Sequence, residues 1–313
     1  MRERRELDSV DGSVVLRLIV SHSITGPIPA SMEGCQTAEL RNYTTIKLRD
    51  HQTMQPSTIG AINSLPEDEK RAIYARYIPT PLLERFHLPD ADSQRIQQFL
   101  QFRFAPGSTD VEMSLFHEKR FPDPILYAHL TDTMNGQVHV LLYILNDPDS
   151  PRFDVDRMPD GTPTKFGTSQ RNLEAEAAAL EAGLAPGQVR HGLRLLGEAI
   201  KAFEGFVKSL GHDMYFVEPL YYHNAVIFER YGFSYQMGKR RMDQIHAGFQ
   251  PGGELSARLD GSTSFRQPDA GNGIRKRSWA IHDGILGEPF TDVTMYKRVG
   301  ISAGISTTPG CSW

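Results

Sequence analysis

The fold is decided by residues 187–242, GQVRHGLRLLGEAIKAFEGFVKSLGHDMYFVEPLYYHNAVIFERYGFSYQMGKRRM, which predict a helix, a strand, a second helix and a second strand. The first helix carries apolar residues at spacings of three and four, which places them on one side of the helix. These residues are Leu196, Ile200, Phe203, Val207 and Leu210. Lys208 lies in the last turn, where a cation suits the helix dipole, and Gly211 follows as a stop signal.

The next elements follow from short apolar runs and their end signals. Residues 214–217 predict a buried strand that ends at Glu218-Pro219. Asn224 either caps the second helix or lies in its first turn, and Gly232 ends that helix. Residues 233–242 then predict a strand. A strand, a crossover helix and a further strand form a right-handed βαβ unit, and ligands bind at the carboxyl ends of such strands.

The chain before residue 187 predicts one strand, two helices and three antiparallel strands. Residues 14–20 are an apolar run expected to form a buried first strand, and residues 21–61 are expected to form a loop. The helices are predicted at 66–77 and 92–102, and the strands at 111–116, 125–130 and 138–145. The last of these is the most continuous apolar strand and is expected at the centre of the sheet.

At this point a family resemblance appears. The stretch Phe228-Glu229-Arg230-Tyr231-Gly232-Phe233 resembles the Y-E-x-x-G-F signature of the GNAT superfamily of N-acetyltransferases. The predicted element order is similar to that of the family, and residues 291–298 resemble its last strand. The resemblance implies an α/β fold, a mixed, mainly antiparallel sheet flanked by helices. We expect a single GNAT-like domain over residues 1–313.

Two insertions depart from the compact family pattern. The first, at about 146–186, holds a predicted helix from Leu173 to Ala182 that Gly183 ends. The second, at about 243–289, contains several glycines and is expected to form a long hairpin arm or lid. Trp279 is expected to anchor this second insertion to the core.

Composition limits the class of protein. The chain has 313 residues, 39% hydrophobic and 23% charged, as is usual for a globular protein. A net charge of −4 gives no general argument for nucleic-acid binding, and no N-terminal apolar run is long enough to span a membrane. The two cysteines, Cys35 and Cys311, favour a reducing cytoplasm. The oligomeric state stays open, with a homodimer as one alternative.

The resemblance also implies a site for acetyl-CoA or another acyl-CoA. In the family, a glycine-rich loop before the long helix holds the phosphates, because glycines let the backbone approach and the helix dipole favours an anion. The matching stretch has one glycine and two arginines, so the family motif is incomplete and the arginines are expected to pair with phosphate. The expected cofactor-binding residues are Leu142, Tyr143, Ile144, Leu145, Gln188, Val189, Arg190, His191, Gly192, Leu193, Arg194, Asn224 and Phe228.

Three residues are candidates for proton transfer. The family's tyrosine acid falls on Phe228, which cannot donate a proton, so nearby tyrosines such as Tyr222 are substitutes. Glu218 ends a strand near the expected amine site, and His223 has a suitable unperturbed pKa. Each can equally be a packed, paired or capping residue. No metal-ligand spacing is present, so no metal site is expected.

One further motif is weaker. Gly271-Asn272-Gly273 precedes Arg275-Lys276-Arg277, a combination that either contacts an anion or forms a solvated loop.

We therefore expect an acyl-CoA-dependent N-acyltransferase that acts on a small-molecule or peptide amine by direct attack on the thioester. Two alternatives stay open. One is a GNAT-like binding or regulatory module without turnover, and the other is an acyltransferase for longer acyl chains, with the insertions around a wider pocket. Neither nucleic acid nor membrane is expected as a partner.

Overall fold

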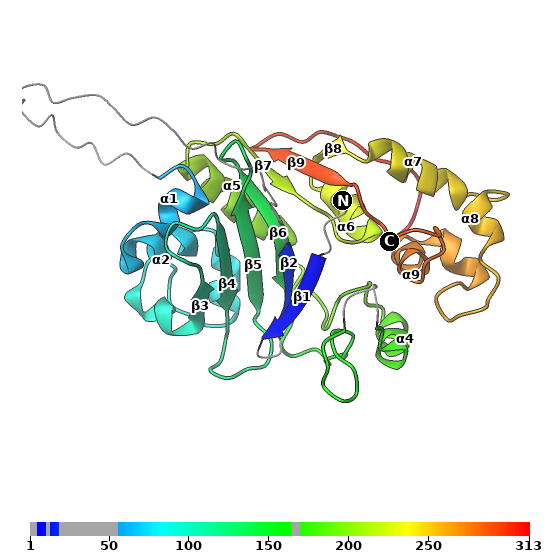
Figure 1. Cartoon of the computed structure of the whole chain (residues 1–313), viewed down its shortest axis with the longest axis horizontal. Helices are drawn as coiled ribbons and strands as arrows, with labels where there is room; N and C mark the ends of the chain where they lie inside the picture. Colours follow the sequence, from blue (N-terminus) through cyan, green and yellow to red (C-terminus); the bar gives the residue numbers. More distant parts are fainter. Residues whose placement is uncertain (1–4, 11–12, 19–55, 165–169) are drawn as a thin grey trace, which may run out of the picture.

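The computed structural model describes residues 56–164 and 170–313, together with the backbone of residues 5–10 and 13–18 (Figure 1). Strand β1 (Arg5–Val10) pairs antiparallel with β2 (Ser13–Leu18) in a two-stranded sheet of its own. The strand predicted at 14–20 therefore exists, but it joins β1 and not the main sheet. Its last two residues, and most of the loop predicted at 21–61, lie outside the described residues.

A seven-stranded sheet forms the centre of the molecule, in the order β3-β4-β5-β6-β7-β9-β8. Every neighbouring pair is antiparallel except β6 and β7, so the sheet is mixed and mainly antiparallel, as predicted. The strands are β3 (Leu100–Arg103), β4 (Asp110–Leu115), β5 (Leu126–Asp132), β6 (Val138–Leu145), β7 (Met214–Val217), β8 (Ser234–Met237) and β9 (Thr294–Arg298). Strand β6 lies fourth of seven, which confirms its central place.

Helices flank the sheet. Helices α1, α2 and α3 gather beside β3 and β4, and α5 passes behind the sheet (Figure 1). Helix α6 lies beside β9, and α7 to α9 lie at the end of the molecule opposite α1 and α2 (Figure 1). Their bounds are α1 (Ile59–Asn63), α2 (Glu67–Ala75), α3 (Thr80–Arg85), α4 (Leu173–Glu181), α5 (Leu196–Ser209), α6 (Tyr222–Arg230), α7 (Lys239–Gly248), α8 (Glu254–Ala257) and α9 (Ile274–His282). Two 3₁₀ helices, Gln94–Phe99 and Pro268–Asn272, complete the set in the described chain.

The apolar stripe of α5 makes this helix the main cover of the sheet. Phe203 and Phe206 are buried, and the Phe203 ring lies 4.9 Å from that of Tyr215 on β7. Both phenylalanines also contact Tyr77, at ring separations of 5.7 and 5.2 Å. Aromatic contacts of this kind add to the free energy gained by burial. The stripe read from the sequence therefore becomes the contact between helix and sheet.

Strands β6 and β7 are parallel neighbours for only two residue pairs. His139 pairs with Phe216 and Val140 with Val217. Strand β7 then ends, while β6 continues to Leu145, still paired with β5. The register between β5 and β6 shifts at His129/Leu130, which marks a bulge. The carboxyl half of β6 thus has no strand partner on the β7 side within the described residues.

Two sequence predictions were wrong in part. The segment 233–242 is a strand only to Met237, because Gly238 (φ +94°) starts helix α7. The helix predicted at 92–102 is a 3₁₀ helix followed by β3. In both segments the apolar residues satisfy either type of element locally, and pairing with β9 or β4 decides where the strand stops.

The second insertion is helical, so the hairpin arm expected at 243–289 was wrong. Its glycines separate the short helices α7, α8 and α9. Trp279 of α9 is fully buried, and its indole N–H donates to the carbonyl of Leu184, which follows α4 in the first insertion, over 2.8 Å. The two insertions share a second, small hydrophobic core: Val155, Ala179, Leu184, Phe265 and Trp279.

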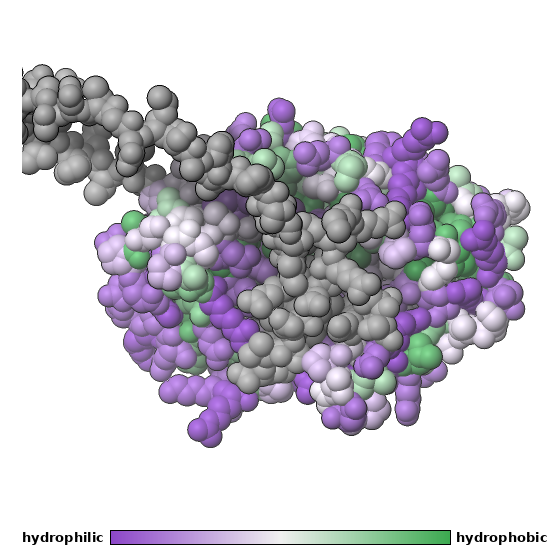
Figure 2. Space-filling view, viewed as in Figure 1, coloured by the Kyte–Doolittle hydropathy of each residue, from purple (hydrophilic) through white to green (hydrophobic). Residues whose placement is uncertain are grey.

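In the described part of the chain, few large hydrophobic residues are exposed. On the face shown in Figure 2, the described surface is mostly hydrophilic, and hydrophobic residues form small, separate patches. This distribution is usual for a folded domain in water.

Candidate functional site

The loop expected to bind phosphate packs against the end of β6 and the start of the first insertion. The backbone N–H of Asp147 donates to the His191 carbonyl over 2.8 Å, and the N–H of His191 donates to Ser150 Oγ over 3.1 Å. A side chain at Gly192 would lie 3.5 Å from the Leu145 carbonyl oxygen. The loop therefore lies directly beside the carboxyl end of the central strand.

Other residues of this loop hold it in place. The Gln188 side chain accepts from the Ala185 N–H over 2.7 Å, and the Val189 carbonyl accepts from the Phe153 N–H over 2.8 Å. Leu193 is buried, and its carbonyl accepts from Arg85 over 3.3 Å. These contacts use side chains and carbonyl oxygens, so they fix the loop without using its glycine.

The structure gives the two arginines of this loop different environments. Arg190 is buried, and its Nε donates to Asp123 Oδ2 over 2.8 Å. It also donates to the carbonyls of Pro148 and Ser150 and lies over the Phe121 ring, 5.3 Å from the ring centroid. A guanidinium held by these groups is not available to a phosphate.

Arg194 is exposed, and within the described chain no hydrogen bond, ion pair or ring contact involves its side chain. Its backbone is left-handed (φ +60°), a conformation that costs a residue with a Cβ about 1 kcal/mol or more. Two residues on, α5 begins without a side-chain cap at Leu195. The first N–H groups of α5 therefore lie beside an unpaired arginine.

The four β6 residues expected to contact the acyl-CoA lie along the part of the strand that β7 leaves unpaired. Leu142, Tyr143, Ile144 and Leu145 are half-buried and pair only with β5 within the described sheet. Burial raises the pKa of Tyr143 well above its usual value, so this phenol stays protonated. The backbone edge toward β7 is thus a short stretch of strand without a strand partner.

Tyr222 and His223, two of the three candidates for proton transfer, are buried against α9. Burial raises the pKa of Tyr222 to about 12, and the nearby charge of Arg277 acts in the opposite direction. The His223 Nδ1 lies 2.9 Å from Ser278 Oγ. Burial, with Arg275 and His282 nearby, lowers the pKa of His223 to about 3. These side chains join α6 to α9, and the buried imidazole is neutral near pH 7.

Glu218, the third candidate, follows β7 directly and is partly exposed. Asn224 lies in the first turn of α6, where its Oδ1 accepts from the Tyr221 N–H over 3.2 Å. Phe228 packs on Phe233 with ring centroids 4.9 Å apart. The structure therefore brings Glu218 to the parted strands and uses Phe228 as a packing residue.

Sequence reasoning assigned no role to Glu229 of the signature stretch. This carboxylate is buried and accepts from the Tyr235 hydroxyl over 2.6 Å. It also accepts from the Thr307 hydroxyl over 2.7 Å and from the Thr307 N–H over 3.1 Å. Glu229 thus attaches the segment 299–313 to α6. The sequence signal for this role is the acidic residue within the signature. Its partner Thr307 lies 78 residues away along the chain, so the contact itself leaves no local pattern.

A second group that the sequence did not reveal joins the two insertions. Glu176 of α4 accepts from Arg171 over 2.9 Å, and its other oxygen lies 3.2 Å from His282 Nε2 of α9. Burial opposes ionisation of Glu176, but the hydrogen bonds from His282 and Arg171 outweigh it and lower its pKa. Tyr221 lies edge-on to His282, with ring centroids 5.6 Å apart. The two insertions therefore contact each other next to the start of α6.

Among the described residues, no group of three or more His, Cys, Asp or Glu side chains is arranged to hold a metal ion. His282 is paired with Glu176, and Asp283 with Arg171 and Arg266.

No protein-family model, curated protein or solved structure matches the chain. What the fold itself defines is a mixed α/β protein with a seven-stranded, mostly antiparallel sheet. Within the described part of the chain, no helix has the length and apolar character needed to cross a membrane.

Proposed function

We propose that the chain is an acyl-CoA-dependent N-acyltransferase with a GNAT-like fold, acting on a small-molecule or peptide amine. The observation that carries the proposal is the β6–α5–β7 unit. Its two parallel strands part after Val140 and Val217, and the uncapped start of α5 lies at the same end. Ligands bind where the carboxyl ends of parallel strands diverge, because backbone groups there lack strand partners.

The two ends of an acyl-CoA would be bound by different parts of this unit. Arg194 and the first N–H groups of α5 would take the phosphates, since an exposed guanidinium and a helix start both favour anions. The unpaired edge of Leu142 to Leu145 would bind the pantetheine amides and the thioester carbonyl. The residues at both places fit the chemistry of this co-substrate.

The reaction would be direct transfer. The amine nitrogen forms a bond to the thioester carbon, the carbon–sulfur bond breaks, and the thiolate leaves with the bonding electrons. The amine must lose a proton, and Glu218 is the partly exposed carboxylate at the end of β7 that would accept it, directly or through water. The thiolate would take a proton from solvent, because Phe228 has none to donate.

Calorimetry with CoA tests the binding step. We expect the parent protein to bind CoA, and Arg194→Ala to weaken binding by about 1.5–3 kcal/mol, the usual range for a hydrogen bond to a charged group. Arg240→Ala is the matched control, because Arg240 is another exposed arginine, at the start of α7. Absence of CoA binding by the parent at about millimolar concentration would reject the transferase proposal.

Thiol release from acetyl-CoA with a panel of amines tests the chemistry. Glu218→Gln should lower turnover by about a hundred- to ten-thousandfold while leaving CoA affinity nearly unchanged, because it removes only the proton acceptor. Equal turnover of parent and variant would remove Glu218 from the mechanism.

A second candidate function is a CoA-binding or regulatory module without turnover. The burial of Tyr222 and His223 against α9 favours it, because neither side chain is presented to the parted strands. CoA binding by the parent together with no thiol release for any amine would select this candidate.

A further inference from the structure

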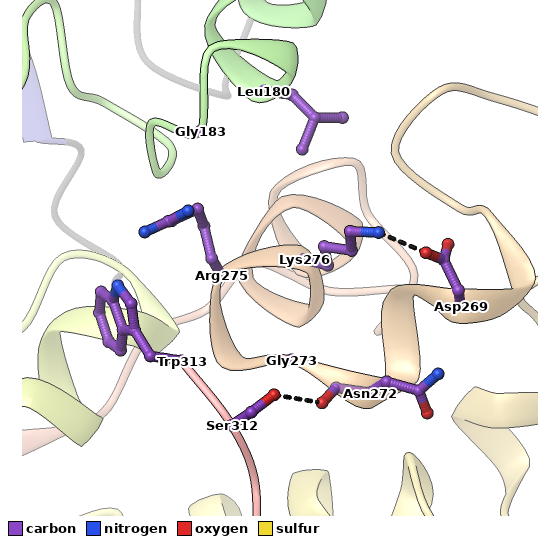
Figure 3. Close-up of a pocket in the computed structure, with 9 residues that line it drawn as sticks. All are labelled: Leu180, Gly183, Asp269, Asn272, Gly273, Arg275, Lys276, Ser312 and Trp313. Atoms are coloured by element: carbon purple, nitrogen blue, oxygen red, sulfur yellow. Dashed lines mark hydrogen bonds and ion pairs between the residues drawn. The ribbon is translucent and has the colours of Figure 1, made fainter.

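The sequence singled out Gly271-Asn272-Gly273 and the basic run after it, and the structure places a cavity there. The cavity has a volume of about 390 Å³. It is lined by the end of α4, by the start of α9 and by residues 312–313 (Figure 3). Its size lies within the range of small-molecule sites. Three segments far apart in the sequence therefore border one open depression on the side of the molecule that the two insertions form.

Arg275, which lines the cavity, and Arg230 of α6 both lie at the ring of Trp313, and neither has an acidic partner among the described residues. The Arg275 guanidinium lies 5.8 Å from the centre of the Trp313 ring, and that of Arg230, on α6, lies 5.3 Å from it. Among the described residues, neither arginine forms an ion pair or a hydrogen bond. Lys276 is paired with Asp269 on the other side of the cavity (Figure 3). The side-chain carboxylate of Asp269 is thus already paired, and it is not available to the two guanidinium groups at the Trp313 ring.

Arg275 differs in this respect from the other arginines of the second insertion. Arg277, two residues on, is buried, donates to the Gly271 carbonyl over 2.6 Å and lies 3.1 Å from His246 Nδ1. Arg266 is paired with Asp283. Burial without an opposing charge lowers the pKa of Arg275. The Trp313 ring attracts both cations, and a bound anion would reduce the repulsion between them.

From this convergence we propose that the cavity is a binding site for a small oxyanion, a phosphorylated or carboxylated molecule held by Arg275 and Arg230 beside Trp313. One guanidinium group can bind two oxygens of a phosphate or a carboxylate at once, so it suits both classes of anion. The proposal does not depend on acyltransferase activity.

Tryptophan fluorescence of the full chain reads this site. The chain has two tryptophans, and Trp313 is 41% exposed whereas Trp279 is buried. Titration with inorganic phosphate, pyrophosphate and succinate at low ionic strength should give a saturable change in emission, with half-saturation below about 1 mM for at least one of them. The phosphate and succinate arms separate the two sources of an oxyanion.

Variants test whether the anion binds in this cavity. Arg275→Gln should raise the dissociation constant by about tenfold or more, as loss of a charged pair does. Arg258→Gln is the matched control, because Arg258 belongs to the same insertion but pairs with Glu254 at the surface. Trp313→Phe should abolish the emission change while calorimetry still detects binding. Arg194→Gln should leave this binding intact, so failure of the CoA site and failure of this site are distinguishable.

Stability measurements test whether Arg275 has a purely structural role. A partly buried cation without an acidic partner opposes folding, and the distant contact with the Trp313 ring offsets only part of that cost, so Arg275→Gln should be as stable as the parent or more stable. A saturable signal that Arg275→Gln weakens and Arg258→Gln does not would support the site. No saturation by any of the three anions up to about 10 mM, equal affinities of the two variants, or a clear loss of stability in Arg275→Gln would overturn it.

Discussion

The Nε of Arg190 donates to Oδ2 of Asp123 over 2.8 Å, and both side chains are buried. Asp123 lies just before β5, so this bond fixes the loop before α5 to the central sheet. Arg152 also donates to Asp123, with its Nε 3.2 Å from the same oxygen. Two arginines thus share one carboxylate, and only Arg194 of the loop remains for an anionic ligand.

Arg190→Ala should therefore destabilise the protein. Removing one partner of a buried ion pair usually costs about 3–5 kcal/mol, and the remaining contact with Arg152 places the expected loss near the lower end. Urea unfolding measures the change. Arg194→Ala is the control and should stay within about 0.5 kcal/mol of the parent, because it is exposed. Equal losses in the two variants would contradict the assignment of Arg190 as the fixed arginine.

Arg194→Gly should leave stability unchanged or raise it by up to about 1 kcal/mol. Glycine relieves the cost of φ +60°, and its greater freedom in the unfolded chain offsets part of that gain. Arg194→Ala keeps the Cβ and should gain nothing. The difference in unfolding free energy between the two variants is the measured quantity. A less stable glycine variant would show that the left-handed backbone is not strained.

Stability should fall on mild acidification because of His223. Its folded pKa is lowered to about 3, whereas a histidine in the unfolded chain titrates near 6.5. Between these values the unfolded chain binds a proton that the folded chain excludes. The free energy of unfolding therefore decreases as the pH falls from about 6.5 toward 3, with a limiting slope of about 1.4 kcal/mol per pH unit.

Urea unfolding of the parent and of His223→Gln, at about pH 7 and about pH 5, measures this contribution. Glutamine keeps a hydrogen-bonding side chain beside Ser278 and does not titrate, so the variant should lose less stability on acidification. His191→Gln, an exposed histidine, should behave like the parent. If the parent and His223→Gln lose the same amount, burial of a neutral His223 is wrong.

Glu229→Gln should loosen the segment 299–313. The amide can accept only part of what the carboxylate accepts from Tyr235 and Thr307, and the expected loss is about 1–3 kcal/mol. Hydrogen exchange in residues 299–313 should be faster in the variant than in the parent, whereas exchange in β6 should stay the same. Thr307→Val removes a single donor and should have a smaller effect. Unchanged exchange in this segment would reject Glu229 as its attachment point.

Local pattern was enough for the central elements of the fold. The bounds predicted for β6 and β7 are those observed, and the apolar stripe of α5 became its buried face. Helix α4 begins at Leu173 and ends before Gly183, as expected. Each of these rests on periodicity and end signals within one element, which a sequence displays directly.

The second insertion was misread because glycine marks a chain reversal without specifying what it connects. Gly252 and Gly253 lie between α7 and α8, where a hairpin loop was expected. What holds these helices is the shared core around Trp279, whose other members, apart from Phe265, come from residues 153–189. Contacts across such a separation leave no local pattern.

The candidate site shows the same difference between local sequence pattern and contacts between distant residues. The sequence by itself determined the β6–α5–β7 unit, the loop before α5 and the types of residue available there, because these depend on short-range spacing. It could not distinguish Arg190 from Arg194, since both are cations, or Glu218 from His223, since both side chains can accept a proton. Tertiary structure gives the members of each pair different environments, because burial and partner choice depend on which distant groups fold alongside: Asp123 for Arg190, and Ser278 for His223.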